Sequence, residues 1–287
     1  MSVEAGPAKR SRPSSSSLGN SVLSIGSSVL SIIKAQPPAQ APTAIPQPII
    51  DLLPPVNPLL SSVRVTEMCG EAGTGKTNMS LSLCLHALLC SPTASTIYLT
   101  CGIEAGGSAF STIPAAIQRF GKMATEYTNR NGGDLNDLLK RFHHLAISTT
   151  DDFQQLFLSP PTSPASINSR VADKNPSLLI IDSLAGLYRA SYSDLPQPPP
   201  HFFFQLTQSL HRLPFHTVMI NQVKNALGGG FVPCFGLTWS CAVNARVFLR
   251  RYEGKGGKWL RKFRIEFGGK GEGEYKIEEW GVCAIEP

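Results

Sequence analysis

The sequence lacks the features that mark membrane, exported and disulfide-stabilised proteins. It has no run of about eighteen apolar residues, and its N-terminus has no apolar stretch of the kind that a secretory signal needs. Its 7 cysteines are scattered and odd in number, and no Cys-x-x-Cys pair occurs. Neither a disulfide framework nor a structural zinc site is indicated. We therefore expect a soluble, unexported protein with reduced cysteines and no membrane partner.

Charge and hydrophobic content are both moderate. The formal net charge is +6, the estimated pI is 9.0 and 42% of the residues are hydrophobic. This hydrophobic content is typical of globular proteins and argues against global disorder. A mildly basic chain suits a polyanionic partner, but many basic proteins bind no nucleic acid, so charge alone leaves that question open.

Residues 1–60 are rich in Ser, Pro and Ala and differ from the rest of the chain. Proline removes backbone donors, so we expect no helix or central strand there and a largely disordered segment. Residues 22–33 alternate small and branched apolar residues and are the one part that we expect to join the core. The folded domain is predicted to span residues 61–287. The prolines that define the segment are Pro37, Pro38, Pro42, Pro46, Pro48, Pro54, Pro55 and Pro58.

A small basic cluster near the N-terminus consists of Lys9, Arg10 and Arg12, beside Pro13 and a serine run. Three interpretations stay open: a nuclear import signal, an Arg- and Ser-rich transit sequence, and a solvated tail. Our prediction is a nuclear location.

From residue 63 onward, short apolar strands alternate with helical segments. This alternation predicts an α/β fold with a mostly parallel central sheet flanked by helices. After Gly236, three strands rich in Arg and Gly are expected to add to one edge of the sheet in antiparallel fashion. The expected strands are residues 63–68, 96–100, 146–148, 178–182, 217–221, 245–252, 259–267 and 274–280, and the expected helices are residues 76–89, 113–128 and 202–213.

A phosphate-binding loop is the strongest motif. The pattern G-x-x-x-x-G-K-[ST] follows a predicted strand and precedes a predicted helix, which is the context that it requires. Its glycines let backbone amides point inward, and the helix N-terminus adds a positive dipole end. An ordinary glycine turn is the alternative. The expected ATP contacts are Gly70, Glu71, Ala72, Gly73, Thr74, Gly75, Lys76, Thr77 and Asn78.

Within this site, Lys76 is expected to reach the β and γ phosphates, and the Thr77 hydroxyl to bind Mg²⁺. The apolar run at residues 178–181 ends in Asp182. In a phosphate-loop fold this carboxylate lies at the edge of the sheet, where it holds Mg²⁺ through water. The predicted cofactors are ATP and Mg²⁺.

Several stretches resemble the RecA-type recombinases of eukaryotes, and above all the recombinase paralogues. The resemblance covers residue 63 to the C-terminus and implies a RecA-like P-loop ATPase core. Its strongest segments are Val65-Thr-Glu-Met-Cys-Gly-Glu, Ile181-Asp-Ser-Leu-Ala-Gly-Leu-Tyr-Arg189, Val218-Met-Ile-Asn-Gln-Val223, Gly236-Leu-Thr-Trp239, Val243-Asn-Ala-Arg246 and Glu279-Trp-Gly-Val-Cys-Ala-Ile285.

The resemblance also implies roles for individual residues. Gln222 would contact the γ-phosphate and communicate with a DNA loop that includes Lys224 and Asn225. A second DNA loop would follow Arg189. The implied partners are single-stranded or branched DNA and other recombinase paralogues, which would form a hetero-oligomer with this chain.

Departures from the family pattern concern hydrolysis and self-assembly. The family's catalytic glutamate lies four residues after the strand tyrosine, where this chain has Gly102, so Glu104 can substitute only if the loop carries an insertion. A Gly-rich stretch at residues 268–273 replaces the segment that caps a neighbouring subunit's nucleotide. We therefore expect an accessory paralogue that binds ATP and DNA, acts in homologous-recombination repair of double-strand breaks, and has slow DNA-stimulated hydrolysis or none.

Two further hypotheses are an active DNA-dependent ATPase that forms filaments on DNA, and a P-loop nucleotide kinase or transferase.

The basic surface of the predicted C-terminal strands also has two interpretations. Basic residues interleaved with aromatics on the C-terminal strands are typical of nucleic-acid binding, but also of edge strands that avoid aggregation. These residues are Arg250, Arg251, Lys255, Lys258, Trp259, Arg261, Lys262, Phe263 and Arg264.

Overall fold

The computed structural model describes residues 45–52, 64–102, 115–191, 200–226, 229–254 and 257–285, without the side chains of residues 189–191 and 200. The predicted core segment at residues 22–33, the basic cluster at Lys9, Arg10 and Arg12, and Glu104 lie outside these ranges. None of the described helices is long and apolar enough to cross a membrane.

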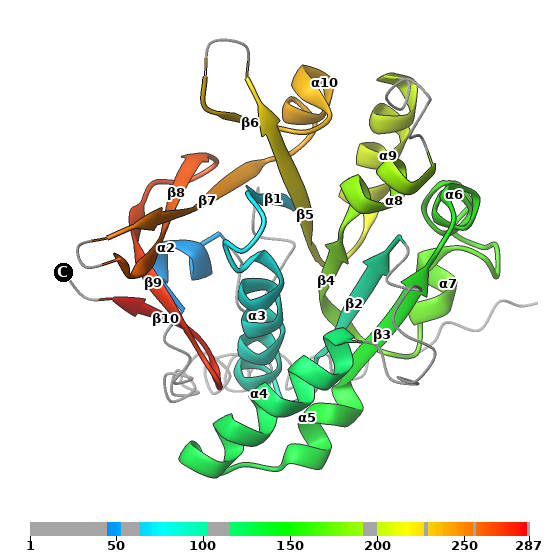
Figure 1. Ribbon diagram of the computed structural model, residues 1–287. Helices are drawn as coiled ribbons and strands as arrows, with labels where there is room; N and C mark the ends of the chain where they lie inside the picture. Colours follow the sequence, from blue (N-terminus) through cyan, green and yellow to red (C-terminus); the bar gives the residue numbers. More distant parts are fainter. Residues whose placement is uncertain are drawn as a thin grey trace, which may run out of the picture. The chain divides into compact units, whose positions relative to one another are not determined.

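A ten-stranded sheet forms the centre of the fold (Figure 1). Its order is β10-β9-β8-β7-β1-β5-β4-β2-β3, with β6 paired to β5 off this path. The strands from β7 to β3 in this order are parallel to their neighbours, whereas β8, β9, β10 and β6 pair antiparallel. Their bounds are β1 (Val65–Gly70), β2 (Ser95–Cys101), β3 (Phe142–Ile147), β4 (Pro176–Asp182), β5 (His216–Asn225), β6 (Phe231–Pro233), β7 (Ala245–Glu253), β8 (Trp259–Phe267), β9 (Glu272–Glu278) and β10 (Gly281–Ile285).

Helices cover both faces of this sheet and enclose two apolar clusters. One face packs against α2 (Gln47–Ile50), α3 (Lys76–Cys90), α4 (Ala115–Asn131) and α5 (Leu135–Arg141). The other face packs against α6 (Thr150–Leu158), α7 (Ile167–Val171), α8 (Leu184–Ser191), α9 (Pro200–Arg212) and α10 (Gly236–Ser240). Every residue of β1 is buried, as expected for a strand covered on both sides. The α/β prediction is confirmed.

Two expectations about local structure were wrong. The strand predicted at residues 245–252 was expected to be antiparallel to its neighbours. Instead, β7 runs parallel to β1 on one side and is antiparallel only to β8 on the other.

The Pro-rich segment was expected to form no helix, yet α2 occurs there. Pro46 caps α2 and Pro48 lies in its first turn, where a missing N–H costs nothing. Ile45, Ile49 and Leu52 bury this turn in the core.

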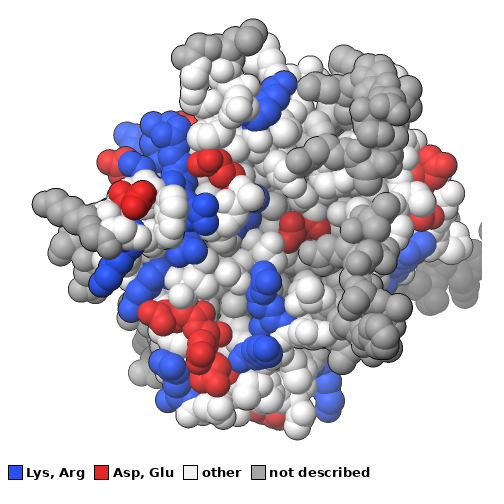
Figure 2. Space-filling view, viewed as in Figure 1, with Lys and Arg blue, Asp and Glu red and all other residues white. Residues whose placement is uncertain are grey.

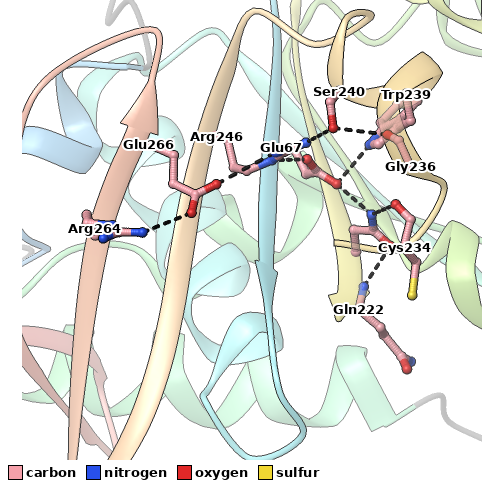
Figure 3. A network of polar contacts seen from close by, with 10 residues as sticks. Glu67, Gln222, Cys234, Gly236, Trp239, Ser240, Arg246, Arg264 and Glu266 are labelled. Carbon is pink, nitrogen blue, oxygen red and sulfur yellow. Dashed lines mark hydrogen bonds and ion pairs between the residues drawn. The ribbon is translucent and has the colours of Figure 1, made fainter. Parts of the chain in front are cut away.

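A buried polar network connects the central strands at one place (Figure 3). Glu67 on β1 is 0% exposed, and its Oε2 accepts from Nε of Arg246 on β7 at 2.5 Å. Its Oε1 accepts from Asn221 Nδ2 on β5 at 2.5 Å and from Trp239 Nε1 on α10 at 2.8 Å. Arg246 also donates to Ser240 Oγ at 2.7 Å. The carboxylate therefore fixes β5, β7 and α10 around β1.

Arg246→Met should lower the free energy of unfolding by about 3–5 kcal/mol, because it leaves a buried carboxylate without its cation. The double variant Glu67→Gln/Arg246→Met should recover part of this loss, since both charges are then gone. Urea denaturation measures both. Lys174→Met is the matched control, because its ion pair with Asp173 lies at the surface, and it should leave the unfolding midpoint unchanged. A single variant as stable as the wild type would contradict the role of the pair.

Candidate functional site

The predicted phosphate-binding loop connects the C-terminal end of β1 to the N-terminus of α3. Gly73 has φ 77° and Gly75 has φ 94°, which only glycine adopts without strain. No side chain among the described residues caps α3, whereas α5, α6 and α7 each have a side-chain cap. The first amides of α3 are therefore directed into the loop, with the positive end of the helix dipole. The geometry suits an anion.

Lys76 lies across the mouth of this loop. Its Nζ donates to the carbonyl oxygens of Gly70 at 2.8 Å and Glu71 at 2.7 Å. These bonds keep the ammonium group at the concave side of the loop, where a phosphate would lie.

Thr77 and Asp182 come together as predicted for a metal site. Thr77 Oγ1 donates to Asp182 Oδ2 at 2.8 Å, although 105 positions separate them in the chain. Both groups are hard oxygen ligands, the type that Mg²⁺ prefers. No group of three or more His, Cys, Asp or Glu residues in the described ranges could hold a metal. One hydroxyl and one carboxylate fit a Mg²⁺ ion that takes its other ligands from phosphates and water.

Tyr98, which the motifs did not reveal as a site residue, positions Asp182. Its buried hydroxyl donates to Asp182 Oδ2 at 2.6 Å. Burial, followed by the nearby Asp182 carboxylate, raises the pKa of Tyr98 well above its ordinary value. The phenol therefore stays protonated and remains a donor throughout the neutral range.

A cavity of about 350 Å³ joins these groups. Thr77, Tyr98 and Asp182 line one part of it, and Gln222 lines another. Since β1, β4 and β5 are parallel, their C-terminal ends meet at one edge of the sheet, where ligands of α/β proteins bind. Gln222 thus lies at the same edge of the sheet as Thr77 and Asp182. Arg119 of α4 lines the same cavity and was missed: the sequence shows a polar helix face but not its direction.

Gly102 follows β2 and also lines this cavity. Its φ is 94°, and a Cβ added there would lie 3.1 Å from backbone atoms of both Gly186 and Leu187. A glutamate at this position would need a different backbone path. The backbone at this position thus suits glycine, while Glu104, the alternative catalytic residue, lies outside the described part of the chain.

The structure describes the side chains of some of the predicted DNA-binding residues but not of all. Lys224 and Asn225 are exposed at the end of β5, in a hairpin with β6 in which Lys224 pairs with Val232 and Asn225 with Phe231. Arg189 is in α8, but its side chain and residues 192–199 lie outside the described part of the chain. Gln222, which lines the cavity, and Lys224, which is in the hairpin, are two residues apart on β5, so the hairpin begins next to the cavity.

Tyr98→Phe should lower the free energy of unfolding by about 1.5–3 kcal/mol near neutral pH, because Asp182 loses a donor. The pKa of Tyr98 is raised in the folded protein, so the stabilisation by its hydroxyl is complete below pH ~10, the ordinary pKa of tyrosine. Above that pH the stabilisation is lost, because the phenol ionises in the unfolded chain but not yet in the folded one. The gap between wild type and variant should therefore shrink above pH ~10, as measured by urea denaturation across pH. Tyr127→Phe is the control at neutral pH, since its hydroxyl has no hydrogen-bond partner among the described residues. A gap that stays constant with pH would contradict the assignment.

This chain is similar to known proteins both in sequence and in structure. Within the RecA-type family, the motif segments most resemble X-ray repair cross-complementing protein three (XRCC3). No protein-family model matches the chain. A "DNA repair protein XRCC3 homolog" of Arabidopsis thaliana is 23% identical over 227 residues, which cover 68% of this chain and 71% of that protein.

Among solved structures, the crystal structure of the RadB recombinase aligns with a TM-score of 0.53 at 19% identity, covering 78% of this chain and 91% of that one. An identity this low is evidence for the fold alone. The chain therefore has a RecA-like recombinase fold, and the predicted resemblance to a RecA-family recombinase paralogue of the XRCC3 type is confirmed.

Proposed function

We propose that this chain is an ATP-binding recombinase paralogue that acts in recombinational repair of DNA, with hydrolysis that is slow or absent. The observation that carries the proposal is the convergence of Lys76, Thr77, Asp182 and Gln222 at one edge of the sheet, three of them on one cavity. The similarity to a DNA repair protein supports the biological setting.

Nucleotide binding would use the residues in separate roles. Backbone amides from Gly73 to Thr77 and the Lys76 ammonium would hold phosphates. Thr77 would be a direct ligand of Mg²⁺ and Asp182 would hold the ion through water, with Tyr98 keeping the carboxylate oriented. The metal would neutralise phosphate charge, and these side chains would fix its position.

Slow hydrolysis follows from Gly102. Hydrolysis needs a group that orients the attacking water, and a glycine in left-handed backbone geometry supplies none. The bound nucleotide would then act mainly on conformation. Gln222, two residues before Lys224 on β5, gives a short covalent route from the phosphates to the exposed hairpin.

The proposed partners are single-stranded or branched DNA and other recombinase paralogues, in the nucleus. Lys224, Asn225 and Arg189 are the proposed DNA contacts, since Lys and Arg neutralise phosphates along a strand. With Gly-rich residues 268–273 in place of the family's capping segment, we propose that the chain functions in a heteromer.

Fluorescent ATP should bind the purified chain with Mg²⁺, and Lys76→Ala should weaken this binding about tenfold or more by removing a charge-assisted contact. Lys174→Ala, which changes a half-buried lysine outside the site, should leave ATP binding unchanged. Turnover should stay slow with or without single-stranded DNA, and Gly102→Glu should not restore it. A strong DNA-stimulated turnover that Lys76→Ala abolishes would instead establish the active ATPase.

Arg189→Gln/Lys224→Gln should weaken binding to single-stranded DNA and reduce the slope of log affinity against log salt by about 1.4, the value for two lost phosphate contacts. Titrations of a labelled oligonucleotide at several salt concentrations measure the slope. Lys140→Gln/Lys174→Gln removes the same charge elsewhere and serves as the control. Equal slopes for the two double variants would rule out these residues as DNA contacts.

A further inference from the structure

One face of the C-terminal strands lies directly against the phosphate-binding loop. Tyr275 on β9 donates its hydroxyl to the Thr74 carbonyl at 2.6 Å. A Cβ added at Gly75 would lie 2.5 Å from Cδ1 of Ile277, also on β9. A Cβ added at Gly73 would lie 2.8 Å from Nη1 of Arg251 on β7. The guanidinium of Arg251 is therefore in the immediate surroundings of the loop.

Arg251 has a second arginine as its direct cross-strand neighbour. Arg251 on β7 is opposite Arg261 on β8, which in turn is opposite Tyr275 on β9. Directly opposite residues share a face, so both guanidinium groups extend from the face that contacts the loop. Like charges in this position repel each other and destabilise a sheet unless something compensates.

No compensating carboxylate is found among the residues that the structure describes. Neither arginine has an acidic oxygen within salt-bridge distance in those ranges. Nε of Arg261 is buried and has no hydrogen-bond partner in the described part of the chain. The acidic residue of β7 on this face, Glu253, is exposed and does not pair with them. Arg251 instead lies over the ring of Trp259, 4.3 Å from its centroid, which holds the guanidinium in place.

The opposite face of the same strands also has two cations directly opposite each other, Arg250 and Lys262, but there carboxylates line the same pocket. Arg264 pairs with Glu266 at 3.1 Å, and a shallow pocket there contains Glu272 and Glu274 beside Arg250. Figure 2 shows blue cations with red carboxylates among them over the C-terminal strands. Among the described residues, Arg251 and Arg261, on the face beside the loop, form no ion pair with a carboxylate, and no carboxylate shares a pocket with them as Glu272 and Glu274 do with Arg250.

We propose that Arg251 and Arg261 are a pair of phosphate-binding residues that contact, within the same chain, the phosphate groups of the nucleotide held by the loop. The assignment rests on the proposed nucleotide binding. A phosphate between two guanidinium groups removes their repulsion, provides an acceptor for the buried Nε, and matches their planar fork of donors. Trp259 positions Arg251 for this contact and does not itself bind the phosphate.

The test compares Arg251→Gln and Arg261→Gln with Arg250→Gln in the full chain. Arg250 is the matched control: it is the neighbour of Arg251 on β7, with its guanidinium over Phe248 on the other face. The dissociation constant for fluorescent MgATP should rise about tenfold in each of the first two variants and stay unchanged in the third. Arg251→Lys should give an intermediate value, because the charge is kept but the fork is lost.

Thermal unfolding separates binding from a structural role. Without nucleotide, Arg251→Gln should melt at the wild-type temperature or above it, since a repulsion is relieved; with MgATP its stabilisation should be smaller than that of the wild type. A variant that melts lower without nucleotide would make Arg251 structural and overturn the proposal.

The remaining outcomes are also decisive. Wild-type affinity for MgATP in both arginine variants would overturn this proposal while leaving nucleotide binding intact. Unchanged MgATP affinity with weaker binding to a single-stranded oligonucleotide would assign the arginines to nucleic acid instead. A wild-type chain that binds no MgATP would overturn the proposed function together with this inference.

Discussion

The buried carboxylate of Glu67 is the interaction on which the arrangement of the site depends. A charge that is 0% exposed requires compensation, and here Arg246, Asn221 and Trp239 all donate to it. These donors come from β7, β5 and α10, while Glu67 itself is on β1, directly ahead of the phosphate-binding loop. A one-residue slip of β7 would remove the cation from Glu67, and a slip of β5 would remove the Asn221 hydrogen bond. The network therefore fixes the register of the strands that carry Gln222 and the C-terminal arginines.

This fixed register has a consequence for communication along β5. Asn221 Oδ1 accepts from the backbone N–H of Gln222 at 2.7 Å, and its Nδ2 donates to both Glu67 and the Cys234 carbonyl. Asn221, which precedes the cavity-lining Gln222, is thus held between β1 and the residues that follow β6. In the proposed function, Gln222 would link bound phosphates to Lys224, which lies two residues further along β5 at the exposed end of the strand.

The sequence predicted those parts of the site that depend on local spacing. The loop from Gly70 to Thr77 was identifiable because one short motif contains both the glycines and the lysine, and Asp182 because it ends an apolar strand. Contacts between distant positions had no such signal. Tyr275 reaches Thr74 across 201 positions, and Arg246 reaches Glu67 across 179. Likewise, the direction of β7 depends on where the chain re-enters the sheet, and α2 depends on the core that buries Ile49.

A nucleotide that stays bound can stabilise a protein without being hydrolysed. Any ligand that binds only the folded arrangement stabilises it, by about 2.7 kcal/mol at one hundred times its dissociation constant. Here the groups that would share the phosphates come from the loop, β4, β5 and, on our inference, β7 and β8. A nucleotide bound among them would stabilise their mutual positions for as long as it stayed intact. On the proposed function, Gly102 would prolong that state, because a glycine brings no side chain to the cavity that it lines. On the function proposed above, slow hydrolysis and an intact phosphate loop are consistent, because the bound nucleotide would hold a conformation that DNA or a partner paralogue recognises.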